Sequence, residues 1–259
     1  MKEAKTIYFD LFFTLITPMY SEKRNENDVL HMSISEWERF AENEILYNKR
    51  ATGMVLNEKE IINDIVQLIP IDINEDQKEE IVKLRKERMK NALTHVDMSI
   101  LQTLEKLKEL GYKLCLISNA DIIDTMYWKD SKLSSYFDHA VFSYQVGYLK
   151  PDLKIYEIAM QYMGSLPEKS YYVGDGGSNE LWGAKELGMT TILTEYLDKK
   201  ETKKRNDIIQ HADFCIDKFT NILDIIIWLR DKFPLPVNRN GRGNFHSGDD
   251  KIIHLVPRI

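Results

Sequence analysis

The distribution of short apolar segments constrains the fold more than any other feature of this sequence. Four segments of strand length each end at a polar side chain: TIYFD (6–10), KLCLISN (113–119), SYYVGD (170–175) and TTILTE (190–195). Their apolar residues run continuously instead of alternating with polar ones, which is typical of strands covered on both faces of a sheet. Helical patterns separate the segments, so the sequence predicts an α/β fold with a parallel, doubly wound sheet.

The intervening helices are indicated by apolar spacing and by residues that start or end helices. Segment 97–111 places isoleucine and leucine residues on one face and ends at Gly111, a favourable helix terminator. Segment 152–164 follows a proline, and segment 178–189 begins at Ser178, a favourable N-cap. The segments ADFCID and FTNILDIIIWLRDKF predict a last strand and a last helix.

Residues 17–95 contain helical patterns only and follow directly on the first strand. We expect this insertion to form an all-helical cap over the sheet edge, with residues 1–16 and 96–234 forming the α/β core. The alternative is a helical subdomain without a role in substrate binding. Residues 235–259 are rich in Gly, Asn and Pro, so we expect a flexible or loosely docked tail, in which IIHLV is a candidate edge strand.

Composition excludes several classes of partner. The 259 residues carry a net charge of -6 without a basic footprint, so we expect no nucleic-acid partner. No run reaches the roughly 18 apolar residues of a membrane span, and the N-terminal residues do not resemble a signal peptide. Cys115 and Cys215 lie in apolar runs, which indicates buried thiols in a reducing compartment. We therefore expect a cytoplasmic protein, and its oligomeric state stays open.

Polar groups stand at or near the carboxyl ends of the predicted strands, where ligands bind in such sheets. Asp10 is a candidate nucleophile or metal ligand, Ser118 offers a hydroxyl, and Asn119 offers an amide. Lys150 supplies a positive charge and Asp175 a second carboxylate. Two facing carboxylates repel each other unless a cation such as Mg²⁺ bridges them. Each motif alone has an ordinary explanation in turn or cap chemistry, but their order and placement together predict phosphoryl transfer.

In these motifs the sequence resembles the haloacid dehalogenase-like (HAD) hydrolase superfamily. The matching motifs, in chain order, are DLFFTL, LISNA, GYLKPD and VGDGGSNELWGAKELGM. The resemblance covers roughly residues 5–232 and implies a Rossmann-like core, with the helical insertion corresponding to the family's C1 cap.

The resemblance also implies roles for individual residues. Asp10 would be the nucleophile that forms an aspartyl-phosphate, and Ser118 and Lys150 would bind the phosphoryl group. The implied magnesium ligands are Asp10, the backbone carbonyl of Phe12, and Asp175, with Glu180 near the metal. The implied substrate is a small phosphorylated molecule, which Asn119 is also placed to contact.

The sequence departs from the family pattern directly after the nucleophile. Most phosphatases of the family carry a second aspartate where this chain has Phe12, and that acid protonates the leaving group and activates water. Loss of general acid–base catalysis commonly costs about 10²- to 10⁴-fold in rate. The glycine that is common at the next position is replaced by Phe13.

Three hypotheses therefore stand. The first is a Mg²⁺-dependent phosphohydrolase; the second is a carbon–halogen hydrolase similar to 2-haloacid dehalogenases; the third is a non-catalytic phosphate-binding module. Dehalogenases carry an aromatic residue at the position of Phe12, but they need no metal and have a serine at the position of Asp175, so Asp175 favours the phosphohydrolase. From the insertion we expect Arg50 or Arg39 to contact substrate, with Arg50 in a loop before Gly53; the alternative is a solvent-exposed arginine.

Overall fold

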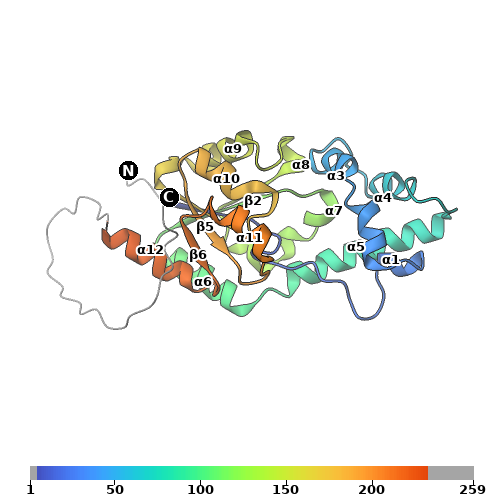
Figure 1. Ribbon diagram of the computed structural model, residues 1–259, viewed down its shortest axis with the longest axis horizontal. Helices are drawn as coiled ribbons and strands as arrows, with labels where there is room; N and C mark the ends of the chain where they lie inside the picture. Colours follow the sequence, from blue (N-terminus) through green and yellow to red (C-terminus); the bar gives the residue numbers. More distant parts are fainter. Residues whose placement is uncertain (1–4, 233–259) are drawn as a thin grey trace.

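The computed structural model of the protein describes residues 5–232, and these contain one six-stranded parallel sheet (Figure 1). Its strands, in spatial order, are β3 (His139–Phe142), β2 (Lys113–Ser118), β1 (Thr6–Phe9), β4 (Ser170–Gly174), β5 (Thr190–Thr194) and β6 (Phe214–Ile216). Every pairing between neighbours is parallel. The predicted doubly wound α/β class is confirmed, and β1 lies at the centre of the sheet, between β2 and β4.

Helices cover both faces of this sheet because successive strand residues point to opposite sides. Ile7 and Phe9 of β1 belong to an apolar cluster with α6 (Met98–Glu109) and α12 (Asn221–Lys232). Tyr8 belongs to a second cluster, with α9 (Leu153–Met163) and α10 (Glu180–Glu186). The remaining longer helix of this part, α11 (Thr202–Ile209), contributes Ile208 to the second cluster.

The sequence patterns do not predict strand β3. It is only four residues long, and its first two residues are half-buried, so its apolar signal is weak. β3 forms an edge of the sheet through its pairing with β2. Two short helices flank it in the chain, α7 (Ile122–Thr125) before it and α8 (Ser143–Val146) after it.

Between β1 and α6 the described chain forms α-helices that begin at Glu26 and no further strand of the sheet. The helices are α1 (Glu26–Val29), α2 (Ile34–Ala41), α3 (Glu44–Ala51), α4 (Glu58–Val66) and α5 (Glu75–Thr94). They lie at one end of the molecule and share an apolar cluster that includes Trp37, Ile61 and Ile81 (Figure 1). Ile123 of α7 joins this cluster, so the helical segment packs against the loop region that follows β2.

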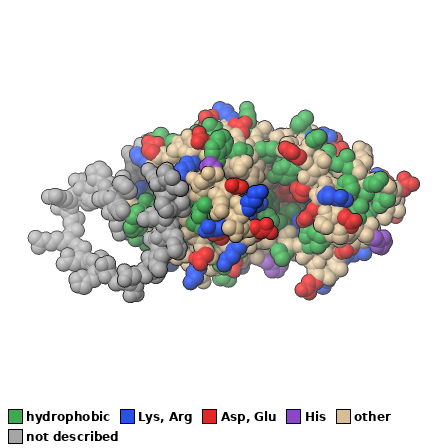
Figure 2. All heavy atoms as spheres, in the orientation of Figure 1, with side chains coloured by type: hydrophobic (Ala, Val, Ile, Leu, Met, Phe, Trp, Pro, Cys, Tyr) green, Lys and Arg blue, Asp and Glu red, His purple; other side chains and the backbone are tan. Residues whose placement is uncertain are grey.

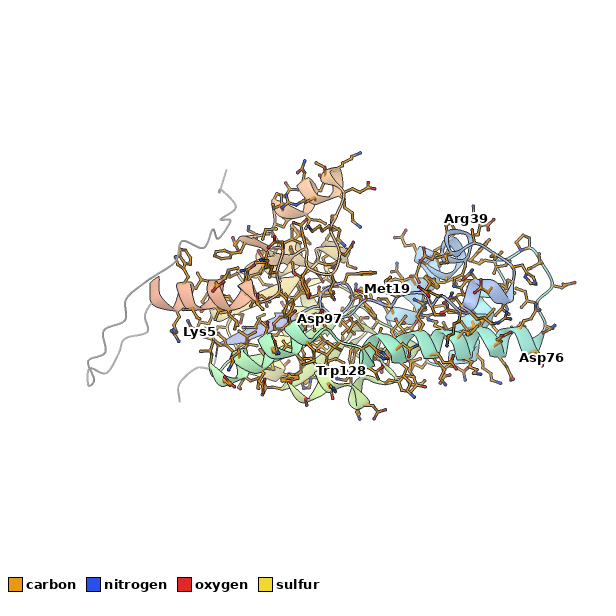
Figure 3. All side chains as sticks on the ribbon, turned by 90° about the horizontal axis from the view of Figure 1, so that it is seen from below. Lys5, Met19, Arg39, Asp76, Asp97 and Trp128 are labelled. Carbon is orange, nitrogen blue, oxygen red and sulfur yellow. The ribbon has the colours of Figure 1, made fainter. Side chains whose placement is uncertain are left out.

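The long helix α5 is the last helix of this segment, and the chain continues from it through α6 to strand β2 of the sheet. Figure 3 shows α5, with Asp76 near its start, and α6, which follows Asp97, nearly end to end along the molecule. Met19 lies between the helical segment and the sheet in the same view. Figure 2 shows acidic and basic side chains interspersed over one face of the molecule. Among the described residues, no helix combines the length and the apolar character that crossing a bilayer requires.

Two predictions need qualification against this fold. Cys115 is buried in β2 as predicted, whereas Cys215 in β6 is only partly buried; both are free thiols. The predicted tail 235–259, with its candidate edge strand IIHLV, lies outside the described residues.

Candidate active site

Asp10 stands directly after the central strand β1, at its carboxyl end. Its backbone N–H donates to the carbonyl of Val173 at 3.0 Å, which continues the pairing of β1 with β4 past the last strand residue. The Thr14 hydroxyl donates to Asp10 Oδ2 at 3.3 Å. The carboxylate is buried, so its position is determined by the sheet and by the turn that follows.

Asp175 and Glu180 approach Asp10 from the end of β4 and the start of α10. The backbone N–H of Gly177 donates to Asp175 Oδ1 at 3.0 Å, and that of Gly176 donates to Glu180 Oε1 at 3.2 Å. A Cβ atom on Gly174 would stand 2.0 Å from Glu180 Oε1, so the approach of Glu180 requires glycine there. Backbone N–H groups of the glycine-rich turn after β4 therefore position both carboxylates, and the lack of a side chain at Gly174 leaves room for Glu180.

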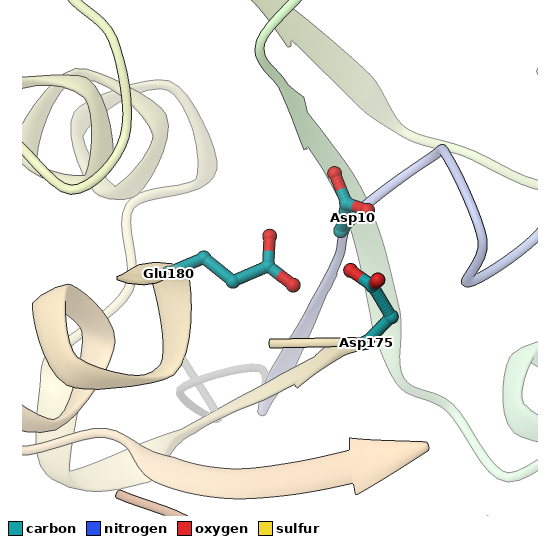
Figure 4. Close-up of side chains that lie close together, drawn as sticks. All are labelled: Asp10, Asp175 and Glu180. Atoms are coloured by element: carbon teal, nitrogen blue, oxygen red, sulfur yellow. The ribbon is translucent and has the colours of Figure 1, made fainter. Parts of the chain in front are cut away.

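The three carboxylates of Asp10, Asp175 and Glu180 converge, as Figure 4 shows. Each offers an oxygen that lies within 4.8 Å of the others, and all three residues are buried. Hard divalent cations prefer oxygen ligands of this kind. The donor set therefore fits Mg²⁺.

Lys150 is the counter-charge to this cluster and lies in the loop after α8. Its ammonium donates to Asp10 Oδ1 and to Glu180 Oε2, each at 2.5 Å. Asn119 holds the backbone of Lys150 from both sides: the Asn119 amide donates to the Lys150 carbonyl at 3.0 Å, and the Lys150 N–H donates to Asn119 Oδ1 at 2.7 Å. Asn119, predicted to bind substrate, thus has a positioning contact in this structure.

Burial and mutual repulsion govern the protonation of the cluster. Burial raises the pKa of Asp10, and the nearby Asp175 adds to that rise, while Lys150 opposes it. Burial and the charge of Asp10 raise the pKa of Glu180 to about 8, although Lys150 lowers it. For Lys150, burial would lower the pKa, but Asp10 and Glu180 outweigh burial and raise it. The site is therefore short of positive charge even with its lysine, which a divalent cation would correct.

The predicted site residues do not all occupy equivalent places. Ser118 ends β2 and is fully buried, and its hydroxyl donates to the carbonyl of Asn119 at 3.5 Å. Asp10, Asn119, Lys150 and Asp175 line a cavity of about 760 Å³, whereas Ser118 is not part of its lining. The sheet side of this cavity thus presents the acidic cluster with Lys150.

The opposite side of the cavity comes from the helical segment. Tyr47, Arg50, Arg85 and Arg88 line it there. Arg50 lies in the last turn of α3 and not in a loop, and it is buried, so both the predicted loop and the exposed alternative are wrong. Helix α3 begins at an Asn43 N-cap and continues through Ala51, so the helical pattern of this stretch extends past Arg50. Arg39 is exposed on α2 (Figure 3) and does not line the cavity.

Buried ion pairs join the helical segment to the loop after β2. The Arg85 guanidinium bonds Asp121 Oδ2 at 2.7 Å and Asp124 Oδ1 at 3.0 Å. Arg50 reaches the same Asp121 oxygen at 3.0 Å, and within the helical segment it also pairs with the exposed side chain of Glu42 at 3.2 Å. Sequence reasoning missed this network, because Arg85 stands in a highly charged helix, where a solvated arginine is the ordinary expectation.

Replacing Arg85 with methionine is expected to lower the free energy of unfolding by about 3–5 kcal/mol, because it removes the cation that two buried carboxylates share and leaves Asp121 with Arg50 alone. Chemical denaturation at neutral pH measures this loss. Lys86→Met is the matched control, since its ion pair with Glu58 is partly exposed and should contribute less than about 1 kcal/mol. Equal stability losses in the two variants would contradict a buried ionic connection at Arg85.

The two phenylalanines after Asp10 differ in their surroundings. Phe12 is half-buried and lines the cavity, and a bridge pairs it with Ile16. Phe13 also lines the cavity and has a backbone φ of +58°, in the left-handed region that glycine adopts most easily. The backbone at Phe13 therefore has a conformation that suits glycine, although the residue carries a large aromatic side chain.

Comparison with known proteins places the chain in a family. A family model described as haloacid dehalogenase-like hydrolase matches residues 41–194, which is more than half of the chain. The glyceraldehyde 3-phosphate phosphatase of Methanopyrus kandleri is 29% identical over 130 residues, which are 49% of this chain and 54% of that protein. The chain thus matches about half the length of this curated relative.

Two solved structures share the fold. A HAD family enzyme of Bacteroides thetaiotaomicron, in complex with magnesium and inorganic phosphate, has a TM-score of 0.59 and 19% identity, covering 77% of this chain and 98% of its own. A 2-haloacid dehalogenase of Pseudomonas syringae has a TM-score of 0.59 and 18% identity, covering 87% and 99%. Since the family match extends over more than half of the chain, the protein belongs to the haloacid dehalogenase-like hydrolases.

Proposed function

We propose that the protein is a Mg²⁺-dependent phosphohydrolase that acts on a small phosphorylated molecule. The observation that carries this proposal is the convergence of three buried carboxylates beside Lys150 at the carboxyl ends of parallel strands. The similarity to phosphatases named for glyceraldehyde 3-phosphate supports a small phosphorylated substrate. The similar structure of the Bacteroides thetaiotaomicron enzyme, which is a complex with magnesium and inorganic phosphate, supports Mg²⁺ as the metal.

Asp10, Asp175 and the backbone carbonyl of Phe12 would hold Mg²⁺, with Glu180 nearby. The metal, when bound, would neutralise charge on the phosphoryl oxygens and on the carboxylates. A carboxylate oxygen of Asp10 attacks phosphorus, the bond from phosphorus to the leaving oxygen breaks, and that oxygen must gain a proton. Water then attacks the Asp10 phosphate, which releases inorganic phosphate and restores the carboxylate.

Lys150 and Ser118 would bind the phosphoryl oxygens in this scheme. Lys150 donates to Asp10 in the present structure, so a phosphoryl group arriving at Asp10 comes within reach of the same ammonium. Ser118 would have to turn its hydroxyl away from the Asn119 carbonyl, to which its contact is long. Asn119 would act on the phosphoryl group by keeping Lys150 in place.

We propose that residues 17–95 act as the cap of this site and that residues 1–16 and 96–234 form the core. The cavity lies between contributions from both. Arg50 would contact the part of the substrate that leaves. Its Nη1 atom is buried without a hydrogen-bond partner among the described residues, and its guanidinium lies over the Tyr47 ring at 5.0 Å.

Carbon–halogen hydrolysis is the second candidate, favoured by the aromatic residue Phe12 beside the nucleophile. Halide leaves without a proton, so this chemistry would not need an acid at position 12. The three facing carboxylates argue against it, because they need a cation to neutralise them and carbon–halogen hydrolysis uses no metal ion.

One set of assays distinguishes the candidates. Turnover of p-nitrophenyl phosphate and acetyl phosphate should depend on Mg²⁺, and 2-chloropropionate should release no chloride. Chloride release that is independent of Mg²⁺ would reject the phosphohydrolase. Absence of both activities, with phosphate still bound, would support a non-catalytic phosphate-binding module.

Phe12→Asp is expected to raise turnover of alkyl phosphates by about tenfold or more. The new carboxyl group lies two residues from Asp10 and, in its protonated form, can donate a proton to the leaving alkoxide, which Phe12 cannot do. p-Nitrophenyl phosphate should gain less, because its leaving group needs little protonation. Steady-state kinetics with both substrates measure the difference.

Phe12→Asn is the matched control, since it has a similar size to aspartate but no acid. Thermal denaturation of both variants shows whether loss of the half-buried ring affects stability. If alkyl phosphate turnover rises equally in both variants, or in neither, the missing acid does not limit the rate.

A further inference from the structure

Lys200 departs from the pattern of the charged segment in which it lies. The run 198–207, DKKETKKRND, predicts a solvated loop or helix start, and Lys199, Lys203 and Lys204 are indeed exposed. The Lys200 side chain is only 7% exposed and turns inward from the loop between β5 and α11. A buried ammonium needs partners that compensate its lost hydration.

The partners of Lys200 belong to the proposed metal site. Its Nζ donates to Asp175 Oδ2 at 2.6 Å and also pairs with Asp198. The ammonium lies 5.6 Å from the centroid of the Phe13 ring. An aromatic face attracts a cation at this distance, so the Phe13 ring helps hold Lys200 beside Asp175.

Asp175 therefore has both oxygens engaged by the protein. Oδ1 accepts from the N–H of Gly177 at 3.0 Å, and Oδ2 accepts from Lys200. A divalent cation bound to the Asp175 carboxylate would lie close to the Lys200 ammonium, which is bonded to the same carboxylate. Two buried positive charges so close together repel each other strongly. Lys150, by contrast, contacts Asp10 and Glu180 and not Asp175 among the hydrogen bonds of the described residues.

We infer that Lys200 competes with Mg²⁺ for Asp175 and keeps the affinity of the site for the metal low. The inference rests on the proposed magnesium site. In the metal-free protein, Lys200 supplies part of the positive charge that the carboxylates lack. Binding of Mg²⁺ then requires Lys200 to leave Asp175 Oδ2 or to share it.

Calorimetric titration with MgCl₂ tests the inference without a measurement of activity. Lys200→Met and Lys200→Gln are expected to bind Mg²⁺ about tenfold more tightly than the parent protein, because the like charge is removed. Lys199→Met is the matched control: it removes the same charge one residue away from an exposed position and should leave the affinity unchanged. Thermal denaturation of each variant checks that it is folded.

The outcomes separate this inference from the proposed function. If the parent protein binds Mg²⁺, Asp175→Asn loses that binding, and both Lys200 variants bind no more tightly than the parent, then Lys200 does not compete and only this inference fails. If Lys199→Met tightens binding as much as Lys200→Met, the effect is one of general charge and the inference also fails. If neither the parent nor the Lys200 variants bind Mg²⁺, the proposed metal site fails together with the inference.

Discussion

Asp10→Asn is expected to lower kcat for p-nitrophenyl phosphate by about 10⁴-fold or more, as removal of a nucleophile does in other hydrolases. An amide is neutral and does not displace the leaving group from phosphorus. Asparagine preserves the size of the side chain: its Oδ1 can still accept from Lys150, while its Nδ2 takes the place of the oxygen that accepts from the Thr14 hydroxyl. The substitution therefore removes the chemistry of Asp10 and leaves its packing.

Stability provides the control for this result. The pKa of Asp10 is raised by burial and by Asp175, so its ionised form is destabilising in the metal-free fold, and a neutral side chain should not lower the melting temperature. Mass spectrometry of acid-quenched protein should detect a phosphoenzyme in the parent and not in the variant. Unchanged turnover in a folded Asp10→Asn variant would remove Asp10 from the reaction.

Lys150→Met is expected to lower turnover by about 10²- to 10³-fold, the effect of losing one group that stabilises charge in a transition state. It should also lower the free energy of unfolding of the metal-free protein by about 3–5 kcal/mol. The physical reason is that Asp10 and Glu180 would face each other and Asp175 in a buried site without their shared cation. Kinetics and urea denaturation measure the two effects.

The matched control for Lys150 is Lys154→Met, whose ion pair with Glu157 has both side chains about half exposed. That variant should lose less than about 1 kcal/mol and keep its turnover. Added Mg²⁺ should restore part of the stability that Lys150→Met loses, since both cations act on the same carboxylates. A Lys150→Met variant that unfolds like the parent and retains full turnover would show that Lys150 serves neither the fold nor the reaction.

The predicted sheet was recovered from sequence because its strands are buried on both faces. Continuous apolar runs identified β1, β2, β4 and β5, and the segment ADFCID identified β6. Strand β3 was not predicted because it has only four residues and the first two are half-buried. Only its last two residues are buried, which is too short an apolar run to indicate a strand. Its place at the sheet edge follows from pairing with β2, which is a long-range contact.

In the candidate site, too, some features were predictable from the sequence and others only from the folded structure. Asp10, Ser118 and Asp175 follow from the sequence alone, because a residue that ends a parallel strand must lie at the carboxyl edge of the sheet. The metal and catalytic roles assigned to them stay predictions that the variants above test. Asn119 was predicted from the same edge, but only the folded loop shows that its amide is engaged by the backbone of Lys150.

The sequence by itself determined the fold class, the family and the edge of the sheet at which chemistry-bearing residues gather, since these depend on local patterns along the strands. Only the tertiary structure decided which charged side chains turn inward. Arg85 and Lys200 lie in segments whose composition is that of solvated surface, and both are buried because carboxylates distant in the chain meet them. Ion pairing of this kind depends on the positions of Asp121 and Asp175 in space, and a linear pattern of charges carries no information on those positions.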